Sequence, residues 1–340
     1  MKAICYTCPG YGLYDIPEPK IQNPDDVIVK TAYAGICGSD IHNILGDQDE
    51  FIGAKPGALT GLGHEASGVI TELGPEATTK GLKVGDKVTY YYNWHCGKCY
   101  YCRNGQEQFC KNVKMHCDFM SEYVLLSEQQ VFKLPDDADL KEAALIEPVS
   151  VVLRGVDLCN IHPGTKVAVS GGGGIGLLFL QLCKMSGAVK LTVIEPVEDK
   201  RNVALELGAD FAIDPMKQDI IKESMAITDG MGFDVVVEAS GVLPALETAY
   251  QICGRGGTLE LFACYPKDTK YALDLDSFWT KEARIVGVFQ SPYLFPRAIE
   301  VYSKLNLKPF LDHIYKPEQY KEAFEIRMSG VPQKVIFDFN

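Results

Sequence analysis

Four cysteines are clustered in one short segment of the chain. Cys96, Cys99, Cys102 and Cys110 follow the spacing C-x2-C-x2-C-x7-C. Four thiolates at this spacing can close a tetrahedron around Zn²⁺ and leave no coordination position open, as in structural zinc sites. Buried or redox-active cysteines and an iron–sulfur cluster are the alternatives. Because the thiols are so closely spaced, the pattern favours structural zinc.

Three separate motifs offer ligands for a second metal site: Cys37-Gly38-Ser39-Asp40-Ile41-His42, Gly63-His64-Glu65 and Ile146-Glu147-Pro148. A catalytic zinc takes three protein ligands and keeps a fourth position for water or substrate. We expect Cys37 and His64 to be ligands, with either Glu65 or Glu147 as the third. The remaining glutamate would hold the zinc-bound water or replace its neighbour during turnover. Each motif taken singly also fits a structural role.

Ser39 and His42 follow the first of these ligands and fit a proton relay. Zinc lowers the pKa of a bound hydroxyl, and the released proton must then leave a site that contains little water. A hydroxyl two residues after a ligand, followed by a histidine that titrates near neutral pH, could carry this proton outward. The alternative is that both residues serve a turn that caps a helix.

A glycine-rich loop predicts a dinucleotide site. The segment Lys166–Ser170 reads as a strand, Leu177–Met185 has helical composition, and Gly171, Gly173 and Gly176 between them form G-x-G-x-x-G. These glycines permit a tight turn, close approach of a pyrophosphate and close packing of helix on strand. The full set expected to contact the cofactor is Gly171, Gly173, Gly174, Ile175, Gly176, Glu195, Lys200, Ser240, Val288 and Phe289.

Glu195 lies 19 residues after Gly176, at the end of the next expected strand. An acid there can accept both ribose hydroxyls and would repel a 2′-phosphate, so NAD is expected rather than NADP. Lys200 and Arg201 are the nearby cations that could offset this preference. Ser240 follows the fourth expected strand, and loops at that end of a parallel sheet line the cofactor crevice.

The elements that must position these residues fall into two classes. Up to about residue 140 the chain reads as short strands separated by Gly and Pro, at Asp26–Ala32, Ala66–Leu73, Asp86–Tyr91 and Glu122–Leu126. From Gly164, apolar strands alternate with amphipathic helices, which indicates a parallel sheet wrapped by helices. The strands expected there are Lys166–Ser170, Leu191–Glu195, Phe211–Asp214, Asp234–Ala239, Thr258–Phe262 and Arg284–Val288.

The length of the chain and this change of pattern predict two domains. A chain of 340 residues exceeds the usual size of a single core. We expect a mainly β domain over 1–148 and 289–340 and a dinucleotide-binding domain over 149–288. A helix over Phe295–Lys304 and a strand over Lys334–Phe339 are assigned to the first domain.

Composition excludes several classes of function. The net charge of −12 opposes binding to nucleic acid or to an anionic membrane, and no apolar run approaches the length of a membrane span. The chain begins directly with strand-like residues, so we expect a cytoplasmic protein. Twelve cysteines in such a protein are better explained by metal binding and burial than by disulfides.

In their order and spacing, these motifs resemble the zinc-containing medium-chain alcohol dehydrogenase family over nearly the whole chain. The resemblance implies an α/β protein with a GroES-like catalytic domain, a Rossmann coenzyme domain, two zinc ions per chain, NAD, and a homodimer or homotetramer. Glu147-Pro148 stands where classical alcohol dehydrogenases have a cysteine ligand, whereas sorbitol-dehydrogenase-like, sugar-phosphate and threonine dehydrogenases have Glu-Pro. Of these groups, the chain most resembles the sorbitol (polyol) dehydrogenases. The resemblance therefore implies hydride transfer between NAD and a secondary alcohol of a polyol or sugar-like substrate.

Two segments depart from the polyol group. Sorbitol dehydrogenases usually read Val-Phe-Arg after the sixth strand, whereas this chain has Val288-Phe289-Gln290. The passage Asp118-Phe119-Met120-Ser121 is also bulkier and shorter than its usual counterpart. A cyclitol, an aminocyclitol, a sugar phosphate such as galactitol 1-phosphate, or threonine is therefore an alternative substrate. A family member that has lost catalysis and serves as a binding or structural protein is the alternative outside the enzymes.

Overall fold

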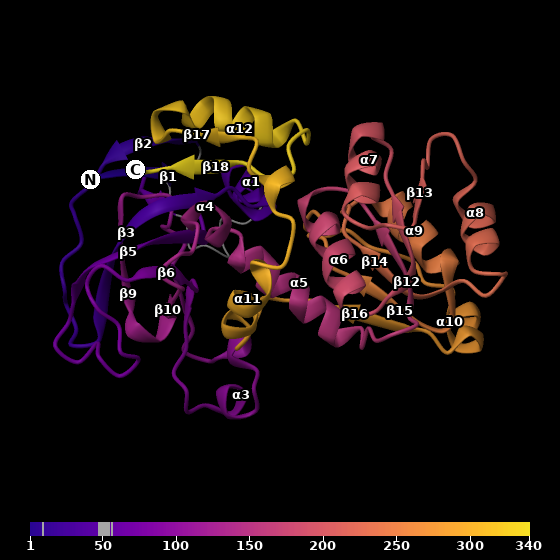
Figure 1. Ribbon diagram of the computed structural model, residues 1–340, viewed down its shortest axis with the longest axis horizontal. Helices are drawn as coiled ribbons and strands as arrows, with labels where there is room; N and C mark the ends of the chain where they lie inside the picture. The colour runs from indigo at the N-terminus through magenta and orange to yellow at the C-terminus, as the bar shows by residue number, and fades with distance from the viewer. Residues whose placement is uncertain (9, 47–54, 56) are drawn as a thin grey trace. The chain divides into compact units, whose positions relative to one another are not determined.

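The structure, a computed structural model, describes residues 1–8, 10–46, 55 and 57–340 and contains two compact units (Figure 1). Unit 1 comprises Met1–Ser150 and Ser291–Asn340, and unit 2 comprises Val151–Gln290. The chain leaves unit 1 within helix α5 (Ile146–Leu158) and returns to it between Gln290 and Ser291.

Unit 1 is built mainly from strands. Its largest sheet has the order β10 (Val131–Lys133), β6 (Lys87–Tyr90), β5 (Glu65–Leu73), β3 (Asp26–Gly35), β18 (Ile336–Asp338) and β17 (Ile314–Tyr315), and β9 (Tyr123–Ser127) also pairs with β3. A smaller sheet has the order β2 (Tyr11–Asp15), β1 (Lys2–Tyr6) and β4 (Thr60–Gly61), and β7 (Asn93–Trp94) pairs with β8 (Lys114–Met115).

Short helices connect these strands. They are α1 (Gly38–Ile44), α3 (Tyr100–Arg103), η1 (Glu107–Phe109), η2 (Glu128–Gln130), α4 (Leu140–Ala143), α11 (Phe295–Tyr302), η3 (Lys308–Phe310), η4 (Pro317–Gln319) and α12 (Tyr320–Met328). The strand predicted near the end of the chain forms as β18, which runs antiparallel to β3. Its pairing with β3 places residues from both ends of the chain in one sheet.

Strand β3 is the centre of unit 1 because it is buried along nearly its whole length and pairs with β5, β9 and β18. Lys30 is its exposed position, and the apolar residues on either side of it are mostly buried. Its pairing with β5 sets Gly35 opposite Glu65. This register joins two of the motifs that the sequence pattern singles out.

Unit 2 is a six-stranded parallel sheet with helices. The strand order is β13 (Phe211–Ile213), β12 (Val189–Ile194), β11 (Lys166–Ser170), β14 (Phe233–Glu238), β15 (Cys253–Leu261) and β16 (Arg284–Gly287). Its helices are α6 (Gly174–Met185), α7 (Glu198–Glu206), α8 (Ile220–Ile227), α9 (Leu243–Ile252) and α10 (Leu275–Lys281). This order is that of a Rossmann sheet, so the predicted fold class is confirmed.

Strand β15 begins five residues earlier than the pattern predicts, at Cys253 rather than Thr258. The added residues include three glycines, and Gly256 has a φ of 70°. The pairing with β14 shifts register between Phe233 and Val235, so the early part of β15 is irregular. Glycine in such a stretch reads as a turn from sequence alone.

The sheet of unit 2 is packed on both faces. One face holds Val236, Leu246 and Ile252 in a core that also includes α8, α9 and α10. On the other face α5 lies against α6 at Gly155, where an added Cβ would overlap Glu260 and the ring of Phe179. This close approach leaves the carboxyl of Glu260 buried in the middle of the unit.

Candidate functional site

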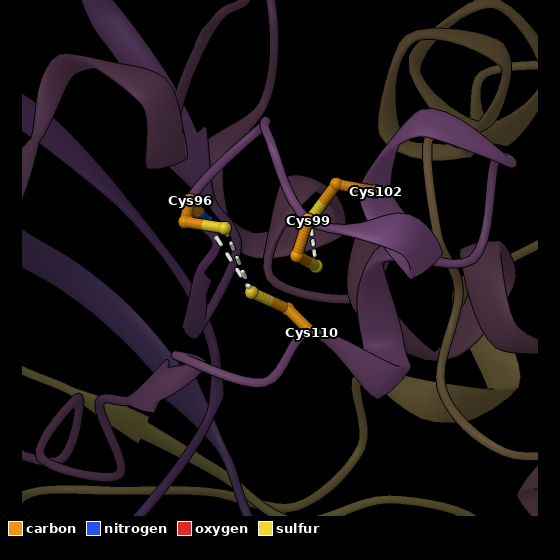
Figure 2. A group of neighbouring side chains, drawn as sticks. All are labelled: Cys96, Cys99, Cys102 and Cys110. Carbon is orange, nitrogen blue, oxygen red and sulfur yellow. Dashed lines mark hydrogen bonds between the residues drawn. The ribbon is translucent and has the colours of Figure 1, made fainter.

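The four cysteines of the predicted structural zinc site lie together in unit 1. One ligand atom from each lies within 4.8 Å of all the others, and Figure 2 shows the thiols pointing toward a common centre. The Sγ atoms of Cys99 and Cys102 are 3.5 Å apart, as are those of Cys96 and Cys110. Zinc–sulfur bonds of about 2.3 Å in a tetrahedron place sulfur atoms roughly 3.8 Å apart, so this group fits zinc.

Backbone N–H groups donate hydrogen bonds to several of these thiols. The N–H groups of Cys96 and Asn112 donate to Cys110 Sγ, each at 3.4 Å. A hydrogen bond from the backbone of Lys98 lowers the pKa of Cys96 to about 6, and one from Cys102 lowers the pKa of Cys99. The thiolate is the form that binds metal, and these hydrogen bonds favour it at Cys96 and Cys99, whereas burial raises the pKa of Cys102.

A second group of ligands is formed by Cys37, His64 and Glu65, whose ligand atoms also lie within 4.8 Å of one another. Cys37 is the N-cap of α1 just after β3, and Glu65 begins β5. Because β3 and β5 are antiparallel neighbours, the end of one and the start of the other meet. One thiol, one imidazole and one carboxylate match the three-ligand set of an open zinc site.

Asp40 supports this group, although the sequence pattern assigned it no role. Its Oδ2 accepts a hydrogen bond from the N–H of Cys37 at 2.8 Å, and its Oδ1 accepts one from the N–H of Gly63 at 3.2 Å. Its Oδ1 also lies 3.6 Å from His64 Nδ1. Asp40 is the third residue of α1, and an acid three residues after an N-cap is the signal that could have identified it.

The negative groups around His64, which are Asp40 and Cys37, favour a cation at this position. Burial opposes the imidazolium, but Asp40 and Cys37 raise the pKa of His64 well above its usual value. Burial likewise opposes ionisation of Asp40, while His64 and the N–H of Cys37 lower the pKa of Asp40. A bound Zn²⁺ would satisfy the same negative groups, so the donor set and its surroundings fit the metal.

Glu65 is paired with Lys334, a residue for which the sequence pattern predicted no role. The two side chains form an ion pair, and 1% of the Glu65 side chain and 10% of the Lys334 side chain are exposed. Gly35 leaves room for this pair, because a Cβ there would overlap the Glu65 carboxylate and lie 2.9 Å from Cε of Lys334. Lys334 is far from Glu65 in sequence, and no local spacing relates them.

Glu147 lies in the first turn of α5 and is buried, with 5% of the residue exposed. Within the described part of the chain, it is not a member of the group that Cys37, His64 and Glu65 form. Burial, and secondarily the charge of Glu65, raises the pKa of Glu147 to about 7, while His64 acts in the opposite direction. The structure thus places Glu147 in the electrostatic environment of the cluster and Glu65 within it.

The two residues of the expected proton relay lie on one helix. Ser39 and His42 belong to α1, which Cys37 caps, and each is partly exposed. They are one helical turn apart, which places their side chains on the same side of the helix. Both side chains thus lie on the helix that Cys37 caps, and both are partly accessible to solvent.

The glycine loop of unit 2 has the geometry expected of a phosphate cradle. Gly171 has a φ of 107°, and a Cβ on Gly176 would overlap the carbonyl oxygen of Gly171. Gly173 caps α6 and has open space where a Cβ would stand. Gly174 and Ile175 form the first turn of α6, whose N–H groups have no acceptors within the helix.

Glu195 lies just after β12 and touches this loop. Its Oε2 accepts a hydrogen bond from the N–H of Gly172 at 2.7 Å, and its Oε1 accepts one from the N–H of Val197 at 2.9 Å. A Cβ on Gly172 would lie 2.9 Å from Cγ of Glu195. These contacts fix the carboxylate beside the phosphate loop, and each oxygen keeps a lone pair for a ribose hydroxyl.

Arg201 is occupied within the fold. Its Nη1 donates to the carbonyl oxygens of Glu195 at 2.7 Å and Pro196 at 2.8 Å, and its Nη2 lies 3.0 Å from Oδ2 of Asp214. The side chains of Arg201 and Asp214 are 12% and 8% exposed. Lys200, the other nearby cation, is partly exposed.

The remaining expected cofactor residues follow the carboxyl ends of β14 and β16. Ser240 comes after β14, where its N–H donates to Oε1 of the buried Glu238 at 2.8 Å. Val288 is partly buried and its N–H donates to the carbonyl of Leu261 at 3.4 Å. Phe289 is 43% exposed. Glu238, which also accepts a hydrogen bond from Tyr265, is a loop-positioning residue that sequence reasoning did not single out.

The described part of the chain contains no helix with both the length and the apolar character needed to cross a membrane.

Comparison with known proteins identifies both units. Residues 23–136 match the alcohol dehydrogenase GroES-like domain, and residues 174–304 match the zinc-binding dehydrogenase domain. L-threonine 3-dehydrogenase of Pyrococcus horikoshii is 35% identical, covering 99% of this chain and 98% of the relative. D-arabitol-phosphate dehydrogenase of Enterococcus avium is 33% identical, covering 100% of this chain and 98% of the relative.

A solved structure from Sinorhizobium meliloti agrees with these matches. It is that of a zinc-binding dehydrogenase bound to NADP, and it has a TM-score of 0.89 at 28% identity. The similarity covers 99% of this chain and 98% of that one. Together with the two domain matches and the two relatives above 30% identity, this shows that the chain belongs to the zinc-dependent medium-chain alcohol dehydrogenase family.

Proposed function

We propose that this dehydrogenase uses NAD to oxidise a secondary alcohol of a polyol or sugar-like substrate to a ketone. The observation that carries the proposal is the group of Cys37, His64 and Glu65, a three-ligand set that leaves a metal with an open position, in a chain that also has a dinucleotide loop. When bound, zinc acidifies a coordinated hydroxyl and the nicotinamide accepts the hydride.

The residues around the cluster have distinct tasks in this proposal. Asp40 orients His64 so that Nε2 is free for metal, because Nδ1 faces the carboxylate. Lys334 holds Glu65 in the cluster. Ser39 and His42 accept the proton of the substrate hydroxyl and pass it along α1 toward solvent.

Glu147 is proposed to act on the open position rather than as a resident ligand. Its carboxyl is buried near the cluster, where it can hold a water molecule or exchange a proton. The four cysteines are proposed to hold a second zinc that braces the fold, which gives two zinc ions per chain.

The proposed substrate class depends on the resemblance of the chain to the polyol group and on the relatives, one of which is a D-arabitol-phosphate dehydrogenase. Glu147-Pro148 fits this class, although sugar-phosphate and threonine dehydrogenases share the motif. L-threonine is the second candidate, because a threonine dehydrogenase is 35% identical over 99% of this chain. Cyclitols, aminocyclitols and other sugar phosphates share the same secondary alcohol. Gln290 and the segment from Asp118 to Ser121 are where this chain departs from sorbitol dehydrogenases.

Preference for NAD over NADP is proposed from Glu195 and Arg201. The Glu195 carboxylate lies against the phosphate loop, where it would repel a 2′-phosphate. Arg201, which could have bound that phosphate, is instead engaged by Asp214 and by two backbone carbonyls. NADP is bound by the Sinorhizobium meliloti structure, so the cofactor must be tested directly.

A homodimer or homotetramer is proposed from the edge of the sheet in unit 2. Strand β16 ends the strand order and pairs with β15 among the described residues. Leu275 and Trp279 on the nearby α10 are 73% and 79% exposed. An open strand edge beside exposed apolar side chains is typical of a surface that pairs with a second copy.

The test is a panel of NAD-linked oxidations with polyols, cyclitols, aminocyclitols, sugar phosphates and L-threonine, combined with metal analysis of the same preparation. We expect reduction of NAD with at least one polyol or polyol phosphate and a zinc content near two per chain. Turnover with L-threonine alone would replace the polyol proposal by the amino-alcohol one. No turnover in a preparation that retains both zinc ions would favour a binding or structural protein.

A further inference from the structure

The segment that returns the chain to unit 1 has an unusual backbone. Gln290 and Tyr293 have φ values of 59° and 58°, in the left-handed region that residues other than glycine rarely adopt. Such conformations persist when the surrounding structure fixes them. We call Gln290–Leu294 the return segment.

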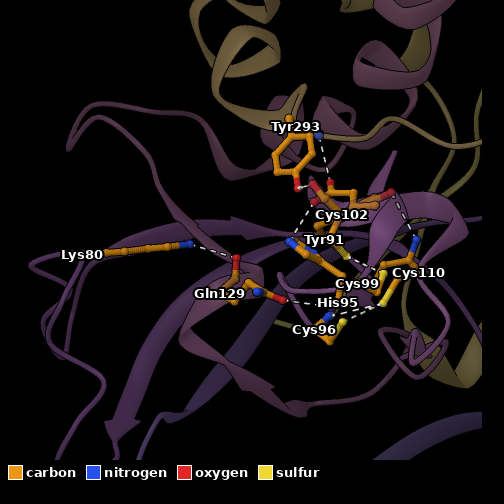
Figure 3. A network of polar contacts seen from close by, with 11 residues as sticks. Lys80, Tyr91, His95, Cys96, Cys99, Cys102, Cys110, Gln129 and Tyr293 are labelled. Carbon is orange, nitrogen blue, oxygen red and sulfur yellow. Dashed lines mark hydrogen bonds and ion pairs between the residues drawn. The ribbon is translucent and has the colours of Figure 1, made fainter. Parts of the chain in front are cut away.

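The loop of residues 95–110, which carries the four cysteines and which we call the four-cysteine lobe, holds this segment through Tyr293 (Figure 3). The N–H of Tyr293 donates to Glu107 Oε1 at 2.9 Å, and its hydroxyl donates to the carbonyl of Cys102 at 3.3 Å. The ring of Tyr293 meets that of His95 edge to face, with 5.7 Å between centroids. Glu107 Oε2 also lies 2.9 Å from Nε2 of His95, the residue before Cys96.

A second set of contacts links the return segment to α5. Ser291 Oγ lies 2.7 Å from Ser150 Oγ, and the Ser150 hydroxyl donates to the carbonyl oxygen of Glu147 at 2.6 Å. Ser150 and Ser291 are both fully buried or nearly so. The return segment therefore makes two contacts. Tyr293 contacts the four-cysteine lobe, and Ser291 contacts Ser150, which is bonded to the carbonyl of Glu147.

The return segment borders a cavity on one side, although Gln290, Ser291 and Pro292 are themselves buried. A cavity of about 250 Å³ is lined by residues that include Tyr91, His95, Ser291 and Tyr293. Polar contacts are therefore needed to fix the part of the segment that faces the cavity. Hydrogen bonds that Tyr293 donates to Glu107 and Cys102, together with the contact between Ser291 and Ser150, hold its position.

We propose that His95, Glu107 and Tyr293 are positioning residues through which the four-cysteine lobe holds Glu147 in place. In this proposal, the lobe holds Tyr293, and Tyr293 holds the return segment. Ser291, in the same segment, then holds the first turn of α5 through Ser150. The consequence for catalysis rests on the proposed function, in which Glu147 serves the open metal position.

The test compares Glu107→Ala with Glu107→Gln, because the glutamine retains an oxygen acceptor for the N–H of Tyr293. Ser291→Ala is the second variant, and it removes the link to Ser150 without touching the lobe. Tyr100→Phe is the matched control, since Tyr100 lies on the same lobe and is 69% exposed. The readouts are amide hydrogen exchange over 288–296 and 146–153, zinc content, and kcat and KM of the holoenzyme.

We expect faster exchange over both segments in Glu107→Ala, faster exchange over 146–153 in Ser291→Ala, and rescue in Glu107→Gln. Zinc content should stay near two while kcat falls roughly 10- to 100-fold with little change in KM, as displacement of a catalytic group by about 1 Å can cause. Unchanged exchange over 146–153 in both variants overturns the proposal. So does an equal effect of Tyr100→Phe.

These readouts separate the proposal from the proposed function. If the wild-type protein oxidises no alcohol in the panel, the function fails, and the exchange data still decide whether the lobe holds the return segment. If Glu107→Ala does not fold, the same decision rests on Tyr293→Phe, which removes the hydrogen bond to the Cys102 carbonyl, while Ser291→Ala tests the link to α5. Faster exchange without any change in kcat would reject the catalytic role of the positioning.

Discussion

The carboxylate of Asp40 faces the imidazole of His64, with 3.6 Å between Oδ1 and Nδ1, and the Asp40 side chain is 1% exposed. A carboxylate on Nδ1 sets the tautomer that leaves Nε2 as the metal ligand and makes the imidazole more basic. Asp40 also accepts hydrogen bonds from the backbone N–H groups of Cys37 and Gly63. One buried acid thus orders the backbone beside two proposed ligands.

Asp40→Asn is expected to weaken zinc binding at the mixed-ligand site by about 10- to 100-fold, the usual effect of losing such a partner. The zinc content should fall from two to one per chain at chelator concentrations that leave the wild type loaded. Asp15→Asn is the control, because Asp15 pairs with Lys2 and its side chain is 78% exposed. Equal retention by Asp40→Asn and wild type would contradict the role of Asp40.

The environment of Arg201 predicts that it supports the fold and not cofactor choice. Arg201→Ala leaves the buried Asp214 without its strongest partner, which should cost about 3 kcal/mol of unfolding free energy. The ratio of kcat/KM for NAD to that for NADP should stay unchanged. Urea unfolding and steady-state kinetics check the two parts separately.

Glu195→Ala should change cofactor preference, in contrast to Arg201→Ala. Loss of charged hydrogen bonds to the ribose predicts a fall in kcat/KM for NAD of about 10- to 100-fold, with a smaller effect on NADP. A variant that keeps the wild-type preference would mean that Glu195 serves only the loop, through Gly172.

Sequence patterns could predict the parts of the site whose residues lie close together along the chain. The glycine loop and the four cysteines are local, and their spacing follows from the turn or tetrahedron that they form. Asp40 lies within the Cys37–His42 motif, but its contact with His64 depends on the direction of α1, which only the fold determines. Lys334 could not be predicted, because it reaches Glu65 only through the pairing of β18 with β3.

The choice between Glu65 and Glu147 was beyond the sequence for a similar reason. Both are acids next to motif residues, and a strand register decides which of them meets Cys37 and His64. Arg201 illustrates the converse case. Its position suggested a phosphate partner, whereas the folded chain surrounds it with carbonyl groups and Asp214.

Glu260 predicts an unusual dependence of stability on pH. It is fully buried on β15 and accepts a hydrogen bond from the Cys159 thiol, with 3.1 Å between Sγ and Oε2. Burial raises the pKa of Glu260 from 4.5 to about 7, while the contact with Cys159 acts in the other direction. The folded chain therefore binds the proton more tightly than the unfolded chain.

Because the folded pKa is the higher one, the stabilising contribution of protonated Glu260 is complete below about pH 4.5 and is lost as pH rises through about 7. Glu260→Gln stays neutral, so it should be more stable than wild type at pH 8 by up to about 3 kcal/mol and little different at pH 5. Chemical unfolding of both proteins at the two pH values checks the sign. A wild-type advantage that grows with pH would contradict it.

The last prediction separates Glu65 from Glu147 as the third zinc ligand. Glu65→Gln removes a charged ligand from the group with Cys37 and His64, and zinc should be lost from that site under mild chelation. Glu147→Gln keeps the group intact, so zinc content should stay near two while turnover falls by about 10²- to 10⁴-fold, the range of general acid–base contributions.

Glu65→Gln also leaves the buried Lys334 without its partner, which should cost about 3–5 kcal/mol of unfolding free energy. Adding Lys334→Met to Glu65→Gln should recover much of that stability without recovering zinc, because the pair and the ligand are separate roles of one carboxylate. If Glu147→Gln loses zinc while Glu65→Gln retains it, the ligand is Glu147 and the pair with Lys334 is purely structural.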